Sequence, residues 1–159
     1  GGFFTGNSGT NTEAGEGPKI TTTVVDLHGE VRLRGWQIRA LWAQFTNSAA
    51  GVDQLDPTDP ARQVGTKAGG AYLEAGYDLL NGRFGKQALI PFLRLERVNT
   101  QKSVVAGIEA DPANDQKITT VRLSWKPLPQ VAVKADAMKV TNAARTGRNQ
   151  FNVALGYYF

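Results

Sequence analysis

Apolar and polar residues alternate along most of this chain, so that each segment has one apolar face and one face of charged or small residues. From residue 21 to residue 33, Val25, Leu27 and Val31 alternate with Asp26 and Glu30. A repeat of two residues is typical of a β-strand whose faces meet different surroundings. The same repeat predicts seven full strands, at residues 21–33, 36–43, 71–79, 89–96, 120–126, 131–138 and 151–159.

The connections between these strands alternate in length. Short turns are predicted at Arg34-Gly35, 81–86 and 127–129, and long polar loops at 7–19, 47–67, 101–116 and 142–149. If consecutive strands are antiparallel, every long loop lies at the same end of one sheet. The opening GGFFTG predicts a further, partial strand, and no segment has a convincing helical period. The sequence therefore predicts a single all-β domain over 1–159.

Charges of both signs occupy the ionic face in equal number. With Arg34-Gly35 as the turn, Glu30 lies opposite Arg39 on the next strand, where unlike charges stabilise a sheet. The ionic face carries six cations and six anions, namely Arg32, Arg39, Arg94, Arg122, Lys126 and Lys134 with Asp26, Glu30, Glu74, Asp78, Glu96 and Asp136. The net charge of +4 therefore lies in loops and turns.

The apolar face carries large aromatic residues near the strand ends that adjoin the short turns. They are Trp36, Tyr77, Trp125, Tyr157 and Phe159. Indole and phenol rings prefer a membrane–water interface, and transmembrane barrels have an apolar band flanked by such aromatic girdles. This pattern predicts an antiparallel transmembrane β-barrel with its ionic face inward. A soluble ligand-binding β-barrel is the alternative.

Nine charged residues of the ionic face are candidate pore-lining residues, because charged side chains in a lumen favour solutes of one sign. They are Glu30, Arg39, Glu74, Arg94, Glu96, Arg122, Lys126, Lys134 and Asp136. For each of them the structural alternative is an ion-pair ladder that holds the wall together. The longest loop, DQLDPTDPARQVGTK at 53–67, mixes both charges and is a candidate for a constriction.

Composition narrows the classes of function. The absence of Cys removes disulfides and thiol chemistry, and the scattered Lys and Arg residues predict no nucleic-acid partner. Asp26, His28 and Glu30 share a strand face but span about 13 Å, too far to ligate one metal ion. No serine lies in a recognisable nucleophile elbow. The sequence therefore predicts a protein that is not an enzyme and that holds no metal or cofactor.

Several stretches resemble, in order, the C-terminal half of bacterial outer-membrane porins that are similar to the phosphate-selective porin O/P-like family. They are HGEVRLRGWQIRALWAQF, GGAYLEAGYDLL, IPFLRLERVNTQ, KPLPQVAVKADAMKV and NVALGYYF. The resemblance implies a barrel of about sixteen to eighteen strands, of which this chain would be the C-terminal half. A complete eight-stranded barrel filled by side chains is the alternative if GGFFTG counts as a strand.

The same resemblance implies a passive diffusion channel in the bacterial outer membrane for small polar solutes, including anions such as phosphate, and commonly a homotrimer. A structural barrel or sleeve around another protein chain is a competing hypothesis. The terminal Phe159 resembles the signal by which the barrel-assembly machinery takes up its substrates. Outer-membrane lipid and that machinery are therefore the expected partners.

Overall fold

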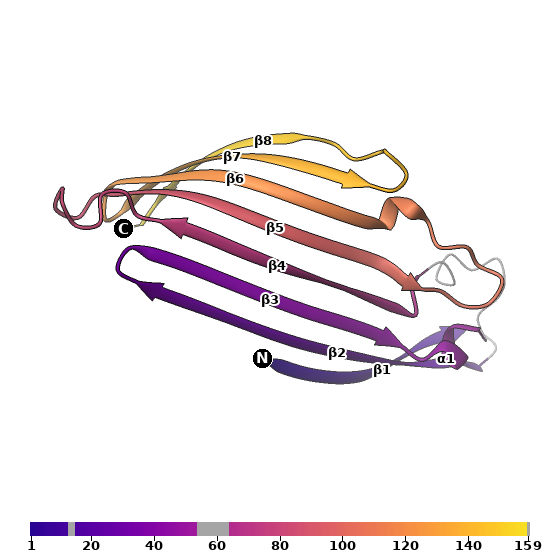
Figure 1. Cartoon of the computed structure of the whole chain (residues 1–159). Helices are drawn as coiled ribbons and strands as arrows, with labels where there is room; N and C mark the ends of the chain where they lie inside the picture. The colour runs from indigo at the N-terminus through magenta and orange to yellow at the C-terminus, as the bar shows by residue number, and fades with distance from the viewer. Residues whose placement is uncertain (13–14, 54–63, 159) are drawn as a thin grey trace.

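The structure, a computed structural model, describes residues 1–12, 15–53 and 64–158. Its strands form one sheet in which every strand pairs antiparallel with its neighbours in sequence (Figure 1). The strands are β1 (Gly2–Thr12), β2 (Gly15–Leu33), β3 (Trp36–Asn47), β4 (Lys67–Tyr77), β5 (Ala88–Ser103), β6 (Asp115–Leu128), β7 (Val131–Asn142) and β8 (Gln150–Tyr157). The prediction of an all-β, antiparallel fold is confirmed.

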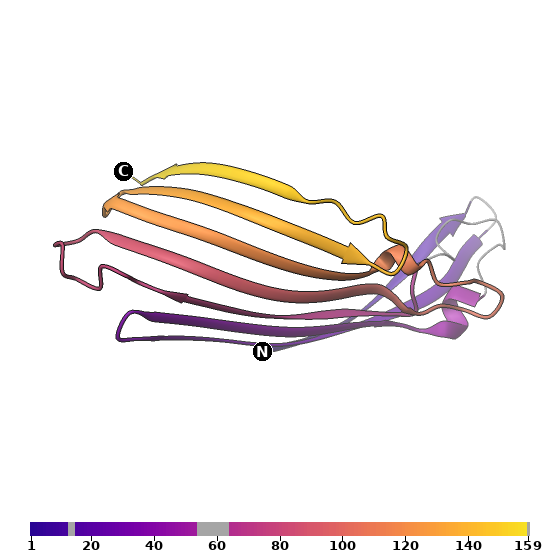
Figure 2. The ribbon, with the colours of Figure 1, turned by 45° about the horizontal axis from the view of Figure 1, so that its top comes forward.

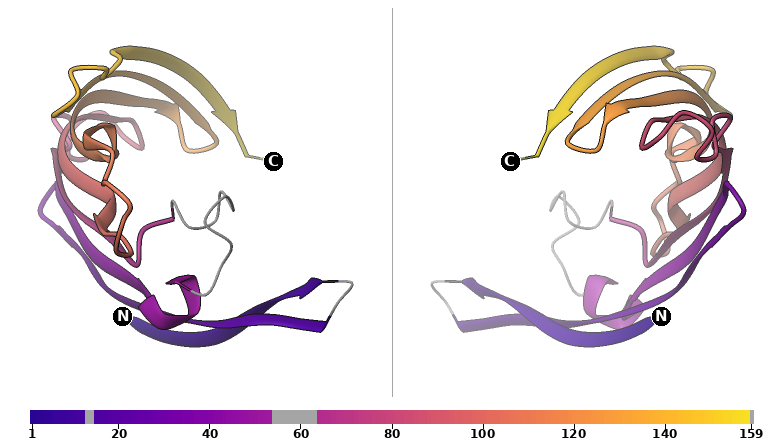
Figure 3. Two further views of the ribbon diagram at one scale, coloured as in Figure 1. Left: turned by 90° about the vertical axis from the view of Figure 1, so that its right-hand side faces the viewer. Right: turned by 90° about the vertical axis from the view of Figure 1, so that its left-hand side faces the viewer.

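The sheet curves into an open C when it is viewed along its strands, with β8 at one end and the β1–β2 hairpin at the other (Figure 3). The short helix α1 (Ala49–Asp53) lies on the concave side. Ile20 of β2 packs against the buried Val52 of α1, so the even-numbered side of β2 is concave. This side carries Glu30, which the register places opposite Arg39 of β3. The ionic face is therefore the concave face.

After β2, the connections 34–35, 78–87 and 129–130 lie at one end of the sheet, and the described parts of 48–66, together with 104–114 and 143–149, lie at the other (Figures 1 and 2). Between β2 and β3, Arg34 and Gly35 both have positive φ, 50° and 90°, as a two-residue hairpin turn of type I′ requires. This turn aligns Leu33 with Trp36 and fixes the register of the whole hairpin. The predicted alternation of short and long connections is confirmed for the segments that follow β2.

The segment 7–19 is predicted as a long loop, and this prediction is wrong. β1 continues to Thr12 and β2 begins at Gly15, and these two residues are paired in register. Backbone hydrogen bonds form the ladder whatever the side chains are, so the Gly, Ser, Thr and Asn residues that suggest a loop are accommodated in a long hairpin. The first strand is accordingly a full strand of 11 residues and not a partial one.

The other strand boundaries differ from the predictions by a few residues. β5 and β6 extend into the predicted loop 101–116, which retains the 3-10 turn η2 (Pro112–Asn114). The turn predicted at 127–129 is instead the two-residue turn 129–130, because Leu128 pairs with Val131. The loop 47–67 opens with α1, whose single turn is too short to show a helical period. Residues 54–63 of this candidate constriction lie outside the described residues.

Candidate functional site: the concave ionic face

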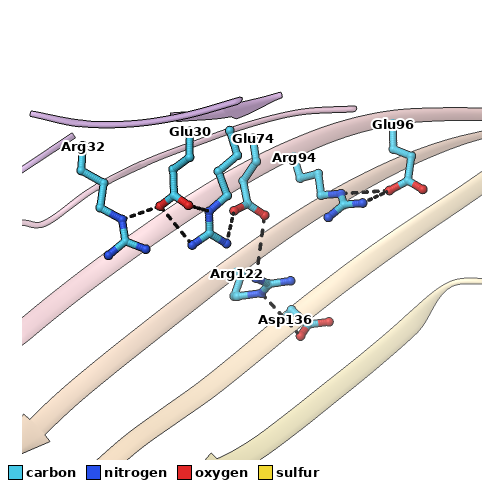
Figure 4. A network of polar contacts seen from close by, with 8 residues as sticks. Glu30, Arg32, Glu74, Arg94, Glu96, Arg122 and Asp136 are labelled. Atoms are coloured by element: carbon cyan, nitrogen blue, oxygen red, sulfur yellow. Dashed lines mark hydrogen bonds and ion pairs between the residues drawn. The ribbon is translucent and has the colours of Figure 1, made fainter. Parts of the chain in front are cut away.

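Six charged side chains form a chain of ion pairs across the concave face, which we call the concave ladder. Its members, in spatial order, are Arg32, Glu30, Arg39, Glu74, Arg122 and Asp136 (Figure 4). The cross-strand register explains the first part of the ladder, because Glu30, Arg39 and Glu74 stand directly opposite one another on β2, β3 and β4. Unlike charges in this position stabilise neighbouring strands.

Glu74 connects the two halves of the concave ladder. Its carboxylate lies 3.7 Å from Nη1 of Arg39 and 3.8 Å from Nη1 of Arg122, so it links β4 to β6 across β5 (Figure 4). The residue is only 3% exposed although no second layer of structure covers the described sheet at this point. Curvature brings the side chains of the concave face together and buries it. A carboxylate this buried is stable only when cations or donors surround it.

Two smaller contacts extend the polar surface around the concave ladder. Nη2 of Arg94 lies 2.7 Å from Oε2 of Glu96, and its Cζ lies 3.7 Å from the ring centroid of Tyr72. This second contact is a cation–π interaction that fixes the guanidinium over the sheet. Asn152 of β8 donates to Oδ1 of Asp136 at 2.8 Å and continues the network to the last strand. The sequence analysis did not include Tyr72 and Asn152 among the candidate residues, although the alternation places both on the ionic face of their strands.

Lys126 and Lys134 stand apart from these contacts. Each of the four arginines of the concave face is paired with a carboxylate. The two other carboxylates of this face have different partners: Asp26 contacts His28, and Asp78 accepts hydrogen bonds from the backbone amides of Leu80 and Leu89. Within the part of the chain that the structure describes, no carboxylate lies within ion-pair distance of Lys126 or Lys134. Among the described contacts, Asp26 and Asp78 likewise have no lysine or arginine partner. The charges of the face therefore balance as a whole, while Lys126 and Lys134 carry positive charge that is not held in an ion pair.

Asp26, His28 and Glu30 do not converge on one point. Nδ1 of His28 lies 2.8 Å from Oδ1 of Asp26, whereas Glu30 turns to Arg32 and Arg39. Over residues 1–12, 15–53 and 64–158, no group of three His, Cys, Asp or Glu side chains is arranged to hold a metal ion. His28 therefore contacts its strand neighbour and takes no part in the concave ladder.

The convex face is apolar and open to its surroundings. Trp36 and Tyr77 are opposite in register, with ring centroids 5.1 Å apart and planes at 57°. Trp125 stands opposite Leu89 and Val133, and Tyr157 opposite Val131. The described girdle residues therefore lie at the short-turn end of their strands. Trp36, Trp125 and Tyr157 are exposed and Tyr77 is half-buried, whereas Phe159 lies outside the described residues. Further large exposed residues are Leu27, Val31, Leu33, Ile38, Trp42, Leu73, Leu93, Leu95, Val121, Leu123, Phe151, Val153 and Leu155.

Comparison with known proteins gives one informative similarity. The chain is 27% identical over 131 residues to an uncharacterized protein of Aquifex aeolicus (strain VF5), an alignment that covers 79% of this chain and 30% of that protein. The chain thus spans about a third of the length of the curated relative that it matches. No known family and no solved structure matches it. None of the helices in the described residues is long and apolar enough to cross a membrane.

Proposed function

We propose that this chain is part of the wall of a passive diffusion channel in the bacterial outer membrane. The observation that carries the proposal is the inverted polarity of the sheet. Leu27, Phe151 and Leu155 are 67%, 70% and 75% exposed on the convex side, whereas the carboxylate-bearing Glu74 is 3% exposed on the concave side. Soluble barrels and sandwiches place their apolar residues inward. A convex apolar face of this extent is suited to lipid.

The extent of the apolar face supports the same proposal. On β3 the convex residues from Trp36 to Trp42 are apolar, with Ile38 and Ala40 between them. Six residue steps cover about 20 Å along a strand. This length is close to the apolar band of about 25 Å that transmembrane barrels present to lipid. The aromatic residues at the short-turn end then correspond to an interfacial girdle, with the short turns at the periplasmic side and the long loops outside.

The edges of the sheet favour a larger barrel. Among the described strands, β1 pairs only with β2 and β8 only with β7. Unpaired backbone groups are costly in hydrocarbon, so a sheet in a membrane closes on itself or on further strands. The relative is also much longer than the part of it that this chain matches. We therefore place the chain as the C-terminal half of a barrel of about sixteen to eighteen strands, within the range of such proteins.

The charges of the concave face favour small polar solutes and, among them, anions such as phosphate. The arginines are held in ion pairs of the concave ladder, where they stabilise the wall. Lys126 and Lys134 supply local positive charge, because no described carboxylate lies within ion-pair distance of either lysine. Fixed charge in a lumen attracts solutes of the opposite sign and requires no chemical step. A homotrimer, with assembly through the barrel machinery acting on β8, belongs to the same proposal.

Planar-bilayer recording tests the proposal directly. The complete protein, purified in detergent from outer membranes, is expected to insert with stepwise increases in conductance. In a KCl gradient its reversal potential is expected to lie closer to the equilibrium potential of chloride than to that of potassium. An absence of conductance steps at every voltage and protein concentration would refute the channel. Quantitative recovery of the protein from the aqueous fraction without detergent would instead favour the soluble ligand-binding barrel.

A further inference from the structure

The convex face is not apolar along its whole length. Towards the long loops it ends in a group of cations that we call the basic rim, formed by Arg97, Lys102, Lys117 and Lys139. Arg97 of β5 stands directly opposite Lys117 of β6, and Lys139 of β7 stands opposite Thr119, the next convex residue of β6. Lys102 projects over the same side, because a Cβ added at Gly69 would lie 2.9 Å from its Nζ.

Among the residues that the structure describes, one carboxylate, that of Asp115, forms an ion pair with the basic rim. Oδ1 and Oδ2 of Asp115 accept hydrogen bonds from Nε and Nη2 of Arg97 at 3.1 and 2.8 Å. This hydrogen-bonded guanidinium lowers the pKa of the Asp115 carboxyl, which stays ionised at neutral pH. Like charges directly opposite one another destabilise a sheet. The pairing of Arg97 with Lys117 therefore leaves positive charge that a further anion would balance.

Among the convex strand residues that the structure describes, cations lie only at the border beside the long loops. At the opposite border, beside the short turns, the convex strand residues that the structure describes are aromatic or aliphatic, as at Trp36, Tyr77, Trp125 and Tyr157. The two borders of the apolar face thus offer different chemistry. One suits an uncharged interface, and the other suits an interface that carries fixed negative charge.

Surface hollows lie along the basic rim, where cations meet the apolar face. One of about 490 Å³ is lined by Leu73 and Leu95 together with Arg97, Lys117 and Glu96, whose carboxylate is paired with Arg94. Another of about 370 Å³ is lined by Trp42, Gly69, Arg97 and Lys102. Each hollow therefore combines apolar and cationic side chains in its lining. Long cationic side chains can cover apolar surface while their charge remains at the interface.

We propose that the basic rim binds the phosphate groups of a phosphorylated lipid in the outer leaflet, whose acyl chains lie against the apolar convex face below. The proposal rests on the proposed membrane location, and it adds a specific lipid headgroup class and a site. Charge complementarity carries it, because no described carboxylate lies within ion-pair distance of the three lysines. Asp115, which acts on Lys102 and Lys117 at longer range, is paired with Arg97. It also predicts that the long-loop end of the sheet is the outer end.

Lipid binding in detergent tests the proposal. The complete protein is titrated with micelles containing bisphosphoryl lipid A, and bound lipid is counted by native mass spectrometry. The variant K117Q/K139Q is expected to bind roughly 25-fold more weakly, because each of the two cations near a phosphorylated surface contributes about a fivefold gain. The matched control R83Q/K86Q removes the same charge from the exposed turn between β4 and β5 and is expected to bind within twofold of the wild type.

Three results would overturn the proposal: an equal loss of binding in the two variants, no loss in either, or displacement of the lipid by millimolar inorganic phosphate. The last result would assign the rim to free phosphate and not to a lipid. Conductance is recorded on the same samples. Conductance without rim-dependent lipid binding refutes only the lipid site, whereas rim-dependent binding without conductance refutes only the channel.

Discussion

Substitution of Glu74 by Gln is expected to weaken the sheet more than any other neutralisation of a single carboxylate on the concave face. Gln has nearly the same volume as Glu, so the change removes charge and leaves the packing in place. The guanidiniums of Arg39 and Arg122, at 3.7 and 3.8 Å, then lose their shared anion. Arg39 retains Glu30 and Arg122 retains Asp136, so the concave ladder divides into two separate parts.

The magnitude follows from the distances and the exposure. Two unit charges about 3.7 Å apart attract by roughly 4 kcal/mol at an effective dielectric constant of about 20. Desolvation of the carboxylate offsets much of this gain, and loss of one partner from a buried pair typically costs about 3–5 kcal/mol. The side chains of Arg39 and Arg122 are 39% and 29% exposed, so solvent screens part of the remaining imbalance. We therefore expect the free energy of unfolding of Glu74→Gln to fall by about 2 kcal/mol.

The assay is urea unfolding in lipid vesicles, followed by tryptophan fluorescence. Glu96→Gln is the matched control, because Glu96 lies on the same face but pairs only with Arg94. The free energy of unfolding of Glu96→Gln is expected to fall by about half as much as that of Glu74→Gln. In a double-mutant cycle with Arg122→Met, the loss of the double variant should be smaller than the sum of the two single losses, as is typical of coupled neighbours. A Glu74→Gln midpoint equal to that of the wild type, or no lower than that of Glu96→Gln, refutes the bridging role.

Three further substitutions probe the remaining features. Replacing Lys126 and Lys134 together by Glu is expected to shift the reversal potential of the channel towards cations, and an unchanged potential in bilayers would show that neither lysine sets the selectivity. Gly76→Val should lower the unfolding midpoint in urea, because a Cβ at Gly76 would lie 2.3 Å from the Phe92 ring, whereas an unchanged midpoint would mean that the ring moves aside without cost. Deletion of Phe159 is expected to reduce the yield in outer membranes more than it reduces stability after refolding, and a normal membrane yield would contradict its role as an assembly signal.

The contacts that sequence reasoning could reach are those that a single hairpin fixes. The Arg34-Gly35 turn sets the β2–β3 register, and the expected opposition of Glu30 and Arg39 follows from it. The contact between Glu74 and Arg122 could not be reached in this way. It crosses β5, and it depends on how strongly the sheet curves, a property that arises from all the strands together. The lysines of the basic rim were likewise missed, because they lie beyond the segments whose alternation was analysed.

Alternation by itself determined which residues share a face of each strand, because successive side chains of a strand point to opposite sides. It also indicated the order of short and long connections beyond β2. It failed where polar residues continue a strand, as in 7–19, because backbone pairing does not depend on apolar side chains. Only the tertiary structure decided that the ionic face is the concave one. The direction of curvature comes from the twist and packing of all the strands together, and it places Glu74 inside a crowded polar surface and the aliphatic residues outside.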